Sequence, residues 1–185
     1  MGSSNSFSAS SVVASARGVY FNPEADSATA PGHQIEDGDL KSRMLDLIEG
    51  DEDIEDITIY SSQLMDGTVG GPLRFHAYVV IKTENWWWSL ERIGEGTTIQ
   101  RSKIKKYVVD HFRRQHRGRN NMTEVISDYG RYCMKDLVEF LHSQNLVYKD
   151  DHLLNFNCTD FAKAIFDRFA KDKTWDRLLE ISSIV

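Results

Sequence analysis

The chain has little cysteine and no long apolar run, and each shortage excludes a class of protein. Two cysteines among 185 residues are too few for a disulfide framework, so we expect reduced thiols in an intracellular protein. No stretch approaches the roughly eighteen apolar residues that a membrane-spanning helix needs. The N-terminus also lacks the basic region and apolar run of a secretory signal, and the sequence therefore predicts a cytoplasmic location.

Metal-binding and phosphate-binding patterns are missing as well. The histidines of the C-terminal half do not form metal-ligand spacing with the two cysteines. Gly94-Glu95-Gly96 is too short for a phosphate-binding loop and instead ends a hairpin. Cys133 has no helix-start signal and no base beside it, so it is predicted to lie in the core. We therefore predict no metal and no cofactor.

The chain is long enough for one ordinary domain with a tail, and its apolar residues cluster after position 40. Residues 1–34 are rich in Ser, Ala and Gly without sustained periodicity, which predicts a flexible arm. Residues 35–185 are predicted to form a single domain. The start Met-Gly-Ser-Ser-Asn-Ser fits the N-myristoylation pattern with Gly2 as acceptor, and it fits a cloning scar equally well.

Charge is distributed unevenly behind a net value of -6. Residues 36–56 hold ten acidic residues against two basic ones, and residues 101–119 hold eight basic residues against one acidic one. Such runs are typical of solvated faces, an anionic partner, a membrane surface or complementarity between the two segments. A basic helix over 103–117 and an acylated Gly2 would together give two membrane signals. The acidic net charge and the lack of a recognised motif argue against nucleic acid.

Apolar spacing predicts the order of the elements. Helical spacing begins at about 39–49 and returns after position 103, most clearly in a C-terminal helix over about 158–171. Between them, strand-like runs cover 57–60, 73–83, 86–93 and 97–100. This order favours an α+β fold with a small antiparallel sheet packed against helices.

Cys158 is the best candidate nucleophile. It follows Asn157, a good N-cap residue, and begins the most strongly patterned helix. Unpaired N–H groups and the dipole at a helix N-terminus stabilise a thiolate. Cys158 also precedes Phe161 and Ala162 by three and four positions, which places it toward the packed face. A small buried cysteine is the alternative interpretation.

His76 is the candidate base, and the hairpin gives it an orienting partner. If Glu84-Asn85 is a two-residue turn, the register sets Tyr78 opposite Glu91 and makes Glu91 the diagonal neighbour of His76. A carboxylate there would hold the imidazole as the third member of a triad does. Ser89 lies on the same face and is the weaker candidate.

Two short motifs resemble a known group of enzymes. Phe156-Asn157-Cys158-Thr159-Asp160-Phe161-Ala162 resembles the Asn-Cys-x-x-Phe motif of circularly permuted papain-fold enzymes, which include lecithin:retinol acyltransferase-like proteins and PPPDE peptidases. Phe75-His76-Ala77-Tyr78-Val79-Val80 resembles their histidine strand, and the order of histidine before cysteine matches the permutation. The resemblance covers roughly residues 73–170.

The resemblance implies a cysteine hydrolase in which His76 deprotonates Cys158 and an acyl-enzyme forms. Asn157, and Trp87, which shares the strand face of His76, are predicted to contact the substrate. The acyltransferases often carry a second histidine and several have a C-terminal membrane helix, neither of which this sequence predicts. A peptidase or isopeptidase is therefore favoured over a lipid or amine acyltransferase, and a non-catalytic module that binds a protein or a membrane is the further alternative.

Overall fold

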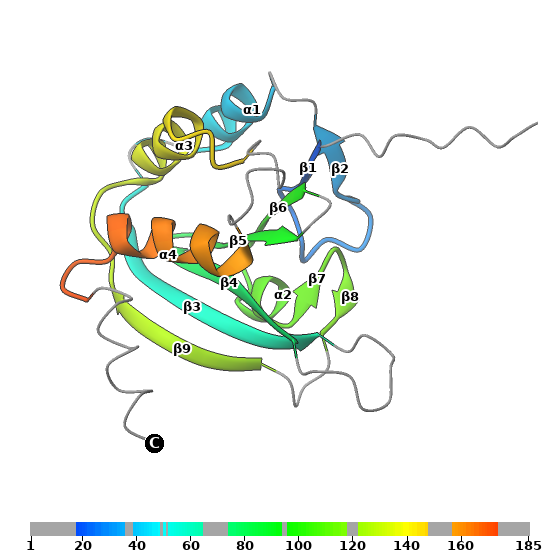
Figure 1. The fold of residues 1–185 in the computed structure, drawn as a ribbon. Coiled ribbons are helices and arrows are strands. Elements are labelled where there is room, and N and C mark those ends of the chain that lie inside the picture. The colour runs from blue at the N-terminus through cyan, green and yellow to red at the C-terminus, as the bar shows by residue number, and fades with distance from the viewer. Residues whose placement is uncertain are drawn as a thin grey trace, which may run out of the picture.

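The computed structural model describes residues 18–35, 39–48, 50, 52–64, 74–93, 96–117, 122–147 and 157–173. Over these ranges the chain has an α+β fold (Figure 1). The strands are β1 (Gly18–Asn22), β2 (His33–Ile35), β3 (Ile54–Leu64), β4 (Arg74–Thr83), β5 (Trp87–Ile93), β6 (Gly96–Ser102), β7 (His111–Phe112), β8 (Gln115–His116) and β9 (Met122–Tyr129). The helices are α1 (Leu40–Leu47), α2 (Lys106–Val109), α3 (Met134–Ser143) and α4 (Cys158–Phe169).

Seven of these strands form one sheet in the order β2-β1-β6-β5-β4-β3-β9, and β7 pairs with β8 separately. The neighbours in the large sheet are antiparallel except β1 and β6, which run parallel. The predicted α+β class with an antiparallel sheet is therefore confirmed, and the sheet is larger than the sequence suggested.

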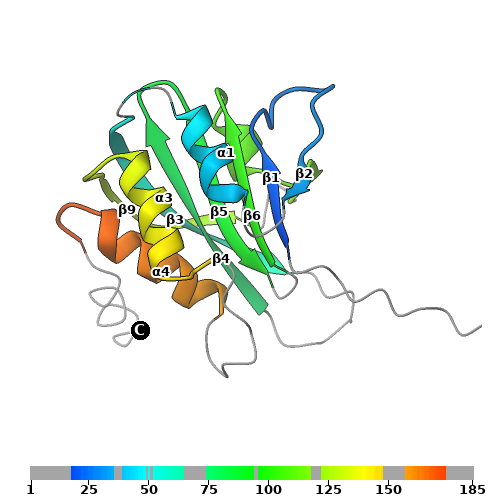
Figure 2. The ribbon, with the colours of Figure 1, turned by 90° about the horizontal axis from the view of Figure 1, so that it is seen from above.

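Helices α1, α3 and α4 cover one face of the large sheet (Figure 2). Alternate residues of the central strands, such as Val79 and Leu90, point to this face and are fully buried. Helix α4 contributes Phe161, Ile165 and Phe166 to the same core, all from one stripe at helical spacing. This packing fixes the position of the N-terminus of α4 relative to β4 and β5.

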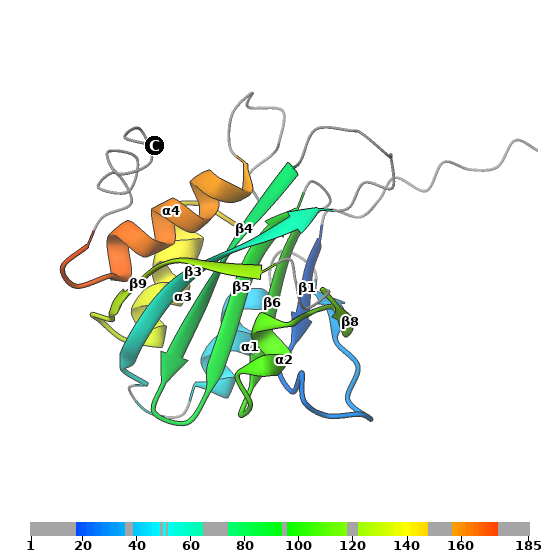
Figure 3. The same cartoon turned by 90° about the horizontal axis from the view of Figure 1, so that it is seen from below.

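The opposite face is covered by α2 and the short β7–β8 hairpin (Figure 3). Here Tyr78 and Val80 of β4 pack with Val108 of α2 in a second, smaller apolar cluster. The buried hydroxyl of Tyr78 donates a hydrogen bond to the Val109 carbonyl at 2.8 Å, which ties α2 to the sheet. Burial raises the pKa of Tyr78, so the phenol remains a neutral donor.

The hairpin between β4 and β5 has the predicted register. The Thr83 N–H donates to the Trp86 carbonyl at 2.9 Å across the Glu84-Asn85 turn, and Tyr78 lies opposite Glu91. The predicted helices over 39–49 and 158–171 are confirmed as α1 and α4. None of the described helices is long and apolar enough to cross a membrane.

The prediction of a flexible arm over residues 1–34 is wrong for its second half. Strand β1 pairs with β6 from Gly18 to Asn22, and β2 pairs with β1 at the edge of the sheet. Val19 and Phe21 are buried in the main core. Because β1 pairs in parallel with a strand far along the chain, no local turn or hairpin signal marks it in the sequence. Gly2 lies outside the described residues.

The prediction of one basic helix over 103–117 is also wrong. Only α2, four residues long, is helical there, and the chain then forms β7 and β8 around left-handed backbone at Arg113 and Arg114. The apolar spacing that suggested a helix belongs to two elements, since Val108 lies in α2 and Phe112 in β7. Strand β9, which pairs with β3, was not predicted.

Gly130 marks the place where β9 meets β3 and α4. Its N–H donates to the Glu55 carbonyl at 2.7 Å, and it forms an isolated bridge with Ala170 at the end of α4. A Cβ atom at this position would lie 2.2 Å from the Ile54 carbonyl oxygen, closer than van der Waals contact permits. Only glycine therefore allows this close approach of three elements.

We expect Gly130→Ala to destabilise the protein by roughly 1–3 kcal/mol, because the Ile54 backbone has to move to admit the methyl group. Denaturant unfolding of this variant beside Lys171→Ala, an exposed neighbour, measures the change. A Gly130→Ala midpoint equal to that of the control would contradict this account of the junction.

Candidate active site at the start of helix α4

A capping box holds the first turn of α4. The Asn157 side chain accepts hydrogen bonds from the N–H groups of Thr159 at 2.8 Å and Asp160 at 3.1 Å. The Asp160 carboxylate in turn accepts from the Asn157 N–H at 3.0 Å. Cys158 is thereby fixed as the first residue of the helix, half-buried, with the positive end of the helix dipole behind its thiol. The predicted helix start is confirmed.

His76 and Glu91 form a buried pair on the neighbouring strands β4 and β5. The imidazole Nε2 lies 2.9 Å from a Glu91 carboxylate oxygen, and the carboxylate is fully buried. The imidazole also stacks on the Tyr78 ring, with the two planes 15° apart. The contact that the hairpin register predicted between His76 and Glu91 is confirmed.

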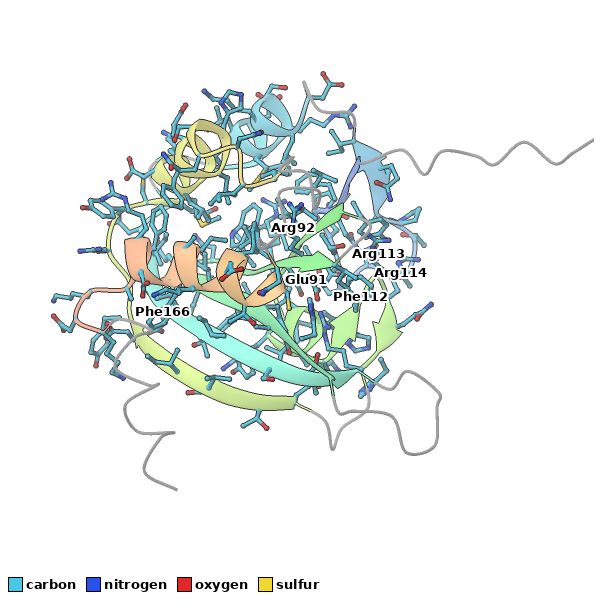
Figure 4. The ribbon with its side chains drawn as sticks, in the orientation of Figure 1. Glu91, Arg92, Phe112, Arg113, Arg114 and Phe166 are labelled. Carbon is cyan, nitrogen blue, oxygen red and sulfur yellow. The ribbon has the colours of Figure 1, made fainter. Side chains whose placement is uncertain are left out.

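The Cys158 thiol contacts the His76–Glu91 pair at the point where strands β4 and β5 stop pairing. Pairing of these strands ends at Tyr78 and Glu91, and the next N–H along β4, that of Ala77, donates a hydrogen bond to the Cys158 sulfur. His76 hydrogen-bonds the same sulfur. Since Nε2 faces Glu91, Nδ1 is the ring nitrogen left for the thiol. Figure 4 shows Glu91 beside the N-terminal end of α4.

These contacts favour a thiolate–imidazolium pair. Burial alone lowers the pKa of His76, but its hydrogen bonds to Cys158 and Glu91 outweigh burial and raise that pKa to about 9. Burial alone raises the pKa of Cys158, yet the hydrogen bonds from His76 and from the Ala77 N–H lower it overall. The two groups titrate as a coupled pair, and both pKa shifts act to move the proton from the thiol to the imidazole.

Arg117 is a member of the site that the sequence did not indicate. Its guanidinium forms an ion pair with the second Glu91 carboxylate oxygen and lies 4.2 Å from the centre of the Tyr78 ring. It therefore fixes the orientation of Glu91 and offsets the cost of burying its charge. In the sequence Arg117 is one base of a long basic run, and no spacing distinguishes it from Arg113 or Arg114.

Other predicted residues lie away from the thiol. Ser89 is buried on the predicted face, but its hydroxyl accepts a hydrogen bond from Gln100 at 3.2 Å rather than orienting His76. Trp87 lies opposite Lys82 at the turn end of β5, about 13 Å along the strand from Glu91. The structure thus does not bring Trp87 to the thiol, and its contact with substrate stays a prediction. Asn157 is exposed, and its side chain is engaged in capping α4.

Cys133 is not the core cysteine that the sequence suggested. It is the half-buried N-cap of α3, and its sulfur and N–H both bind the Asp136 carboxylate. The partner of the Cys133 thiol is thus a carboxylate, whereas that of the Cys158 thiol is an imidazole. Over the described ranges, no group of three or more His, Cys, Asp or Glu side chains is arranged to hold a metal ion.

Comparison of the chain with protein-family models, curated proteins and solved structures gives no match. The chemistry is therefore inferred from the side chains of the site and their geometry.

Glu91→Gln removes the charge that holds the imidazolium while keeping the side chain's shape. We expect the pKa of Cys158 to rise, with a roughly tenfold slower alkylation by iodoacetamide at mildly acidic pH. Both variants are made in a Cys133→Ser protein, because serine is a good N-cap and Cys158 is then the thiol that iodoacetamide modifies. Glu139→Gln, which loses an exposed ion pair with Lys41, is the matched control. Equal rates in the two variants would contradict the role of Glu91.

Arg117→Gln is expected to act in the opposite direction. Without the guanidinium, the Glu91 charge acts on His76 alone, so the alkaline step of the Cys158 alkylation profile moves above its value of about pH 9. Arg114→Gln is the control, since Arg114 is exposed and donates a hydrogen bond to the Ser27 carbonyl, away from Glu91. An alkaline step that moves down or stays in place would show that Arg117 does not act on His76 through Glu91.

Proposed function

We propose that the chain is a cysteine-dependent hydrolase, a peptidase or isopeptidase, that acts through an acyl-enzyme on Cys158. One observation carries the proposal: a buried Glu91–His76 pair hydrogen-bonds the thiol at the start of α4. A structural cysteine needs no lowered pKa and no oriented imidazole, whereas a nucleophile needs both.

In the first half of the reaction the Cys158 thiolate attacks the substrate carbonyl carbon and forms a carbon–sulfur bond. The carbonyl π electrons move to oxygen, and the resulting oxyanion needs hydrogen-bond donors. Asn157 engages the N–H groups of Thr159 and Asp160, so the N–H of Cys158 is the donor at this helix start that the cap leaves for the oxyanion. The His76 imidazolium then protonates the leaving amine as the carbon–nitrogen bond breaks.

In the second half, the neutral imidazole takes a proton from water, and the hydroxide formed attacks the thioester. The carbon–sulfur bond breaks, the acid product leaves, and the thiolate and imidazolium are restored. Glu91 stays ionised throughout as a positioning residue that stabilises the imidazolium. Arg117 has the same kind of indirect role, since it contacts Glu91 and not the thiol.

We further propose that the fold is a circularly permuted papain-like one, similar to that of the PPPDE peptidases and lecithin:retinol acyltransferase-like proteins. The chain order supports this, because the histidine strand β4 precedes the cysteine helix α4. The thiol begins a helix that packs on the sheet bearing the histidine, as those families require. A lipid or amine acyltransferase shares the acyl-enzyme and differs only in the carbonyl donor and the acceptor.

The activated ester p-nitrophenyl acetate tests the covalent step without knowledge of the substrate. We expect a burst of p-nitrophenol and a mass increase of one acetyl group at Cys158. Cys158→Ala should abolish the burst, His76→Ala should slow it by roughly 10²–10⁴-fold, and Cys133→Ser should leave it unchanged. A burst that survives Cys158→Ala, or no acetyl-enzyme in the unaltered chain, would contradict the proposal and favour a non-catalytic binding module.

The pH profile of the acetylation rate follows from the coupled pair. The thiolate must be present, so activity begins below the ordinary pKa of a thiol, because the pKa of Cys158 is lowered. The imidazolium must be present to protonate the amine that leaves an amide substrate. Peptide cleavage therefore declines as pH rises through about 9, where the imidazolium loses its proton. Rates with amide and ester substrates measured across pH check both limbs. An acid limb at the ordinary thiol value would contradict the thiolate–imidazolium pair.

A further inference from the structure

A second feature lies at the opposite end of the sheet from Cys158, where the β4–β5 turn meets the junction of β6 and α2. We name the lysine–tryptophan patch by its residues: Trp86, Trp87, Lys103, Ile104, Lys105 and Lys106. The three lysines and Ile104 are exposed, and the two tryptophans are half-buried. The patch has no part in the chemistry proposed above, because β5 runs from Trp87 at this end to Glu91 at the other.

The lysines of the patch are arranged over the indole rings. The Lys103 ammonium lies 5.1 Å from the centre of the Trp86 ring, and the Lys105 ammonium lies 4.9 Å from that of Trp87. Such cation–π contacts place the ammonium groups over the indole rings, so positive charge and aromatic surface lie side by side in the patch. The segment 101–109 contains no acidic residue, and Glu84 of the neighbouring turn is the exposed acid nearest in sequence to the tryptophans.

Ile104 is an exposed apolar member of the patch and is held by a turn. It is 46% exposed, although large aliphatic side chains are usually covered. The fully buried Ser102 hydroxyl accepts a hydrogen bond from the Ile104 N–H at 2.9 Å and lies 3.0 Å from the Ile104 carbonyl oxygen, to which it donates. This turn holds a partly exposed apolar side chain between the two exposed lysines Lys103 and Lys105.

We propose that the lysine–tryptophan patch docks the protein on an anionic phospholipid surface. An exposed aliphatic side chain, two half-buried indoles and three exposed lysines match the acyl boundary, the headgroup level and the anionic charge of a leaflet surface. Ile104 enters the acyl boundary, the tryptophans lie at the headgroup level, and the lysines bind lipid phosphates and carboxylates. Of the basic residues between positions 101 and 119, the three lysines around this turn contribute to the proposed lipid-binding surface, while Arg117 contacts Glu91 in the active site.

A nucleic acid fits the patch less well. Single-stranded nucleic acids bind basic surfaces by stacking bases on open aromatic faces. Here the Arg101 guanidinium lies 3.8 Å from the centre of the Trp86 ring, and Lys105 lies over the Trp87 ring, so cations already occupy these faces. An exposed isoleucine adds nothing to the binding of phosphates but does add to the binding of a lipid leaflet.

Vesicle flotation of the full chain, produced in bacteria without N-myristoyl transferase, tests the patch independently of Gly2. We expect binding to vesicles of phosphatidylcholine with phosphatidylserine, little binding to phosphatidylcholine alone, and a decline with added salt. Lys103→Glu/Lys105→Glu should lower the binding constant by at least roughly 25-fold, since each lysine near an anionic leaflet contributes about fivefold. Ile104→Ser should lower it several-fold with all lysines intact.

The matched control is Lys41→Glu/Lys171→Glu, which makes the same change in net charge on other surfaces. It should bind nearly as well as the unaltered chain. The alkylation rate of Cys158 reports folding, and it should be equal in all variants because the patch and the thiol lie at opposite ends of the sheet. Equal binding to charged and neutral vesicles, equal loss in both double variants, or binding of a fluorescent oligonucleotide without binding of vesicles would overturn the proposal.

Discussion

The buried carboxylate of Glu91 is the group on which the arrangement of the site depends. A fully buried charge is tolerated only when partners surround it, and Glu91 has His76 on one oxygen and Arg117 on the other. These partners come from β4 and from the segment after β8, so one carboxylate links three parts of the chain. The hydrogen bonds of His76 to Cys158 and to this carboxylate together raise the pKa of the imidazole against the effect of burial, and the imidazole in turn lowers the pKa of the Cys158 thiol.

The two motifs of the site were predictable because their signals are local. The Glu84-Asn85 turn fixes the β4–β5 register, and a side-chain period of two then brings Glu91 to His76. Asn157 marks the start of α4 through a cap that involves only the next three residues. The contact between Cys158 and His76 is different, because it depends on where β4 and β5 separate. Sequence order and family resemblance suggested this contact, and local spacing did not.

The features that the sequence did not reveal depend on distant partners. Strand β1 is stable because it pairs with β6, far along the chain, and buries Val19 and Phe21 in the core. Its own sequence carries no signal of this pairing and reads as a flexible segment. Arg117 contacts Glu91 only because left-handed backbone at Arg113 and Arg114 turns the basic segment back toward the sheet. Helical spacing over 103–117 was misleading, since its apolar residues pack from two separate elements.

The most direct measurement is the protonation of His76, followed by NMR of its imidazole signals across pH in the unaltered protein and in Cys158→Ala. We expect an imidazolium in the unaltered protein at neutral pH that titrates at about 9. In Cys158→Ala the value should fall, because the thiolate partner is lost while Glu91 remains. A neutral His76 imidazole at neutral pH in the unaltered protein, or an identical titration in both proteins, would contradict the thiolate–imidazolium pair.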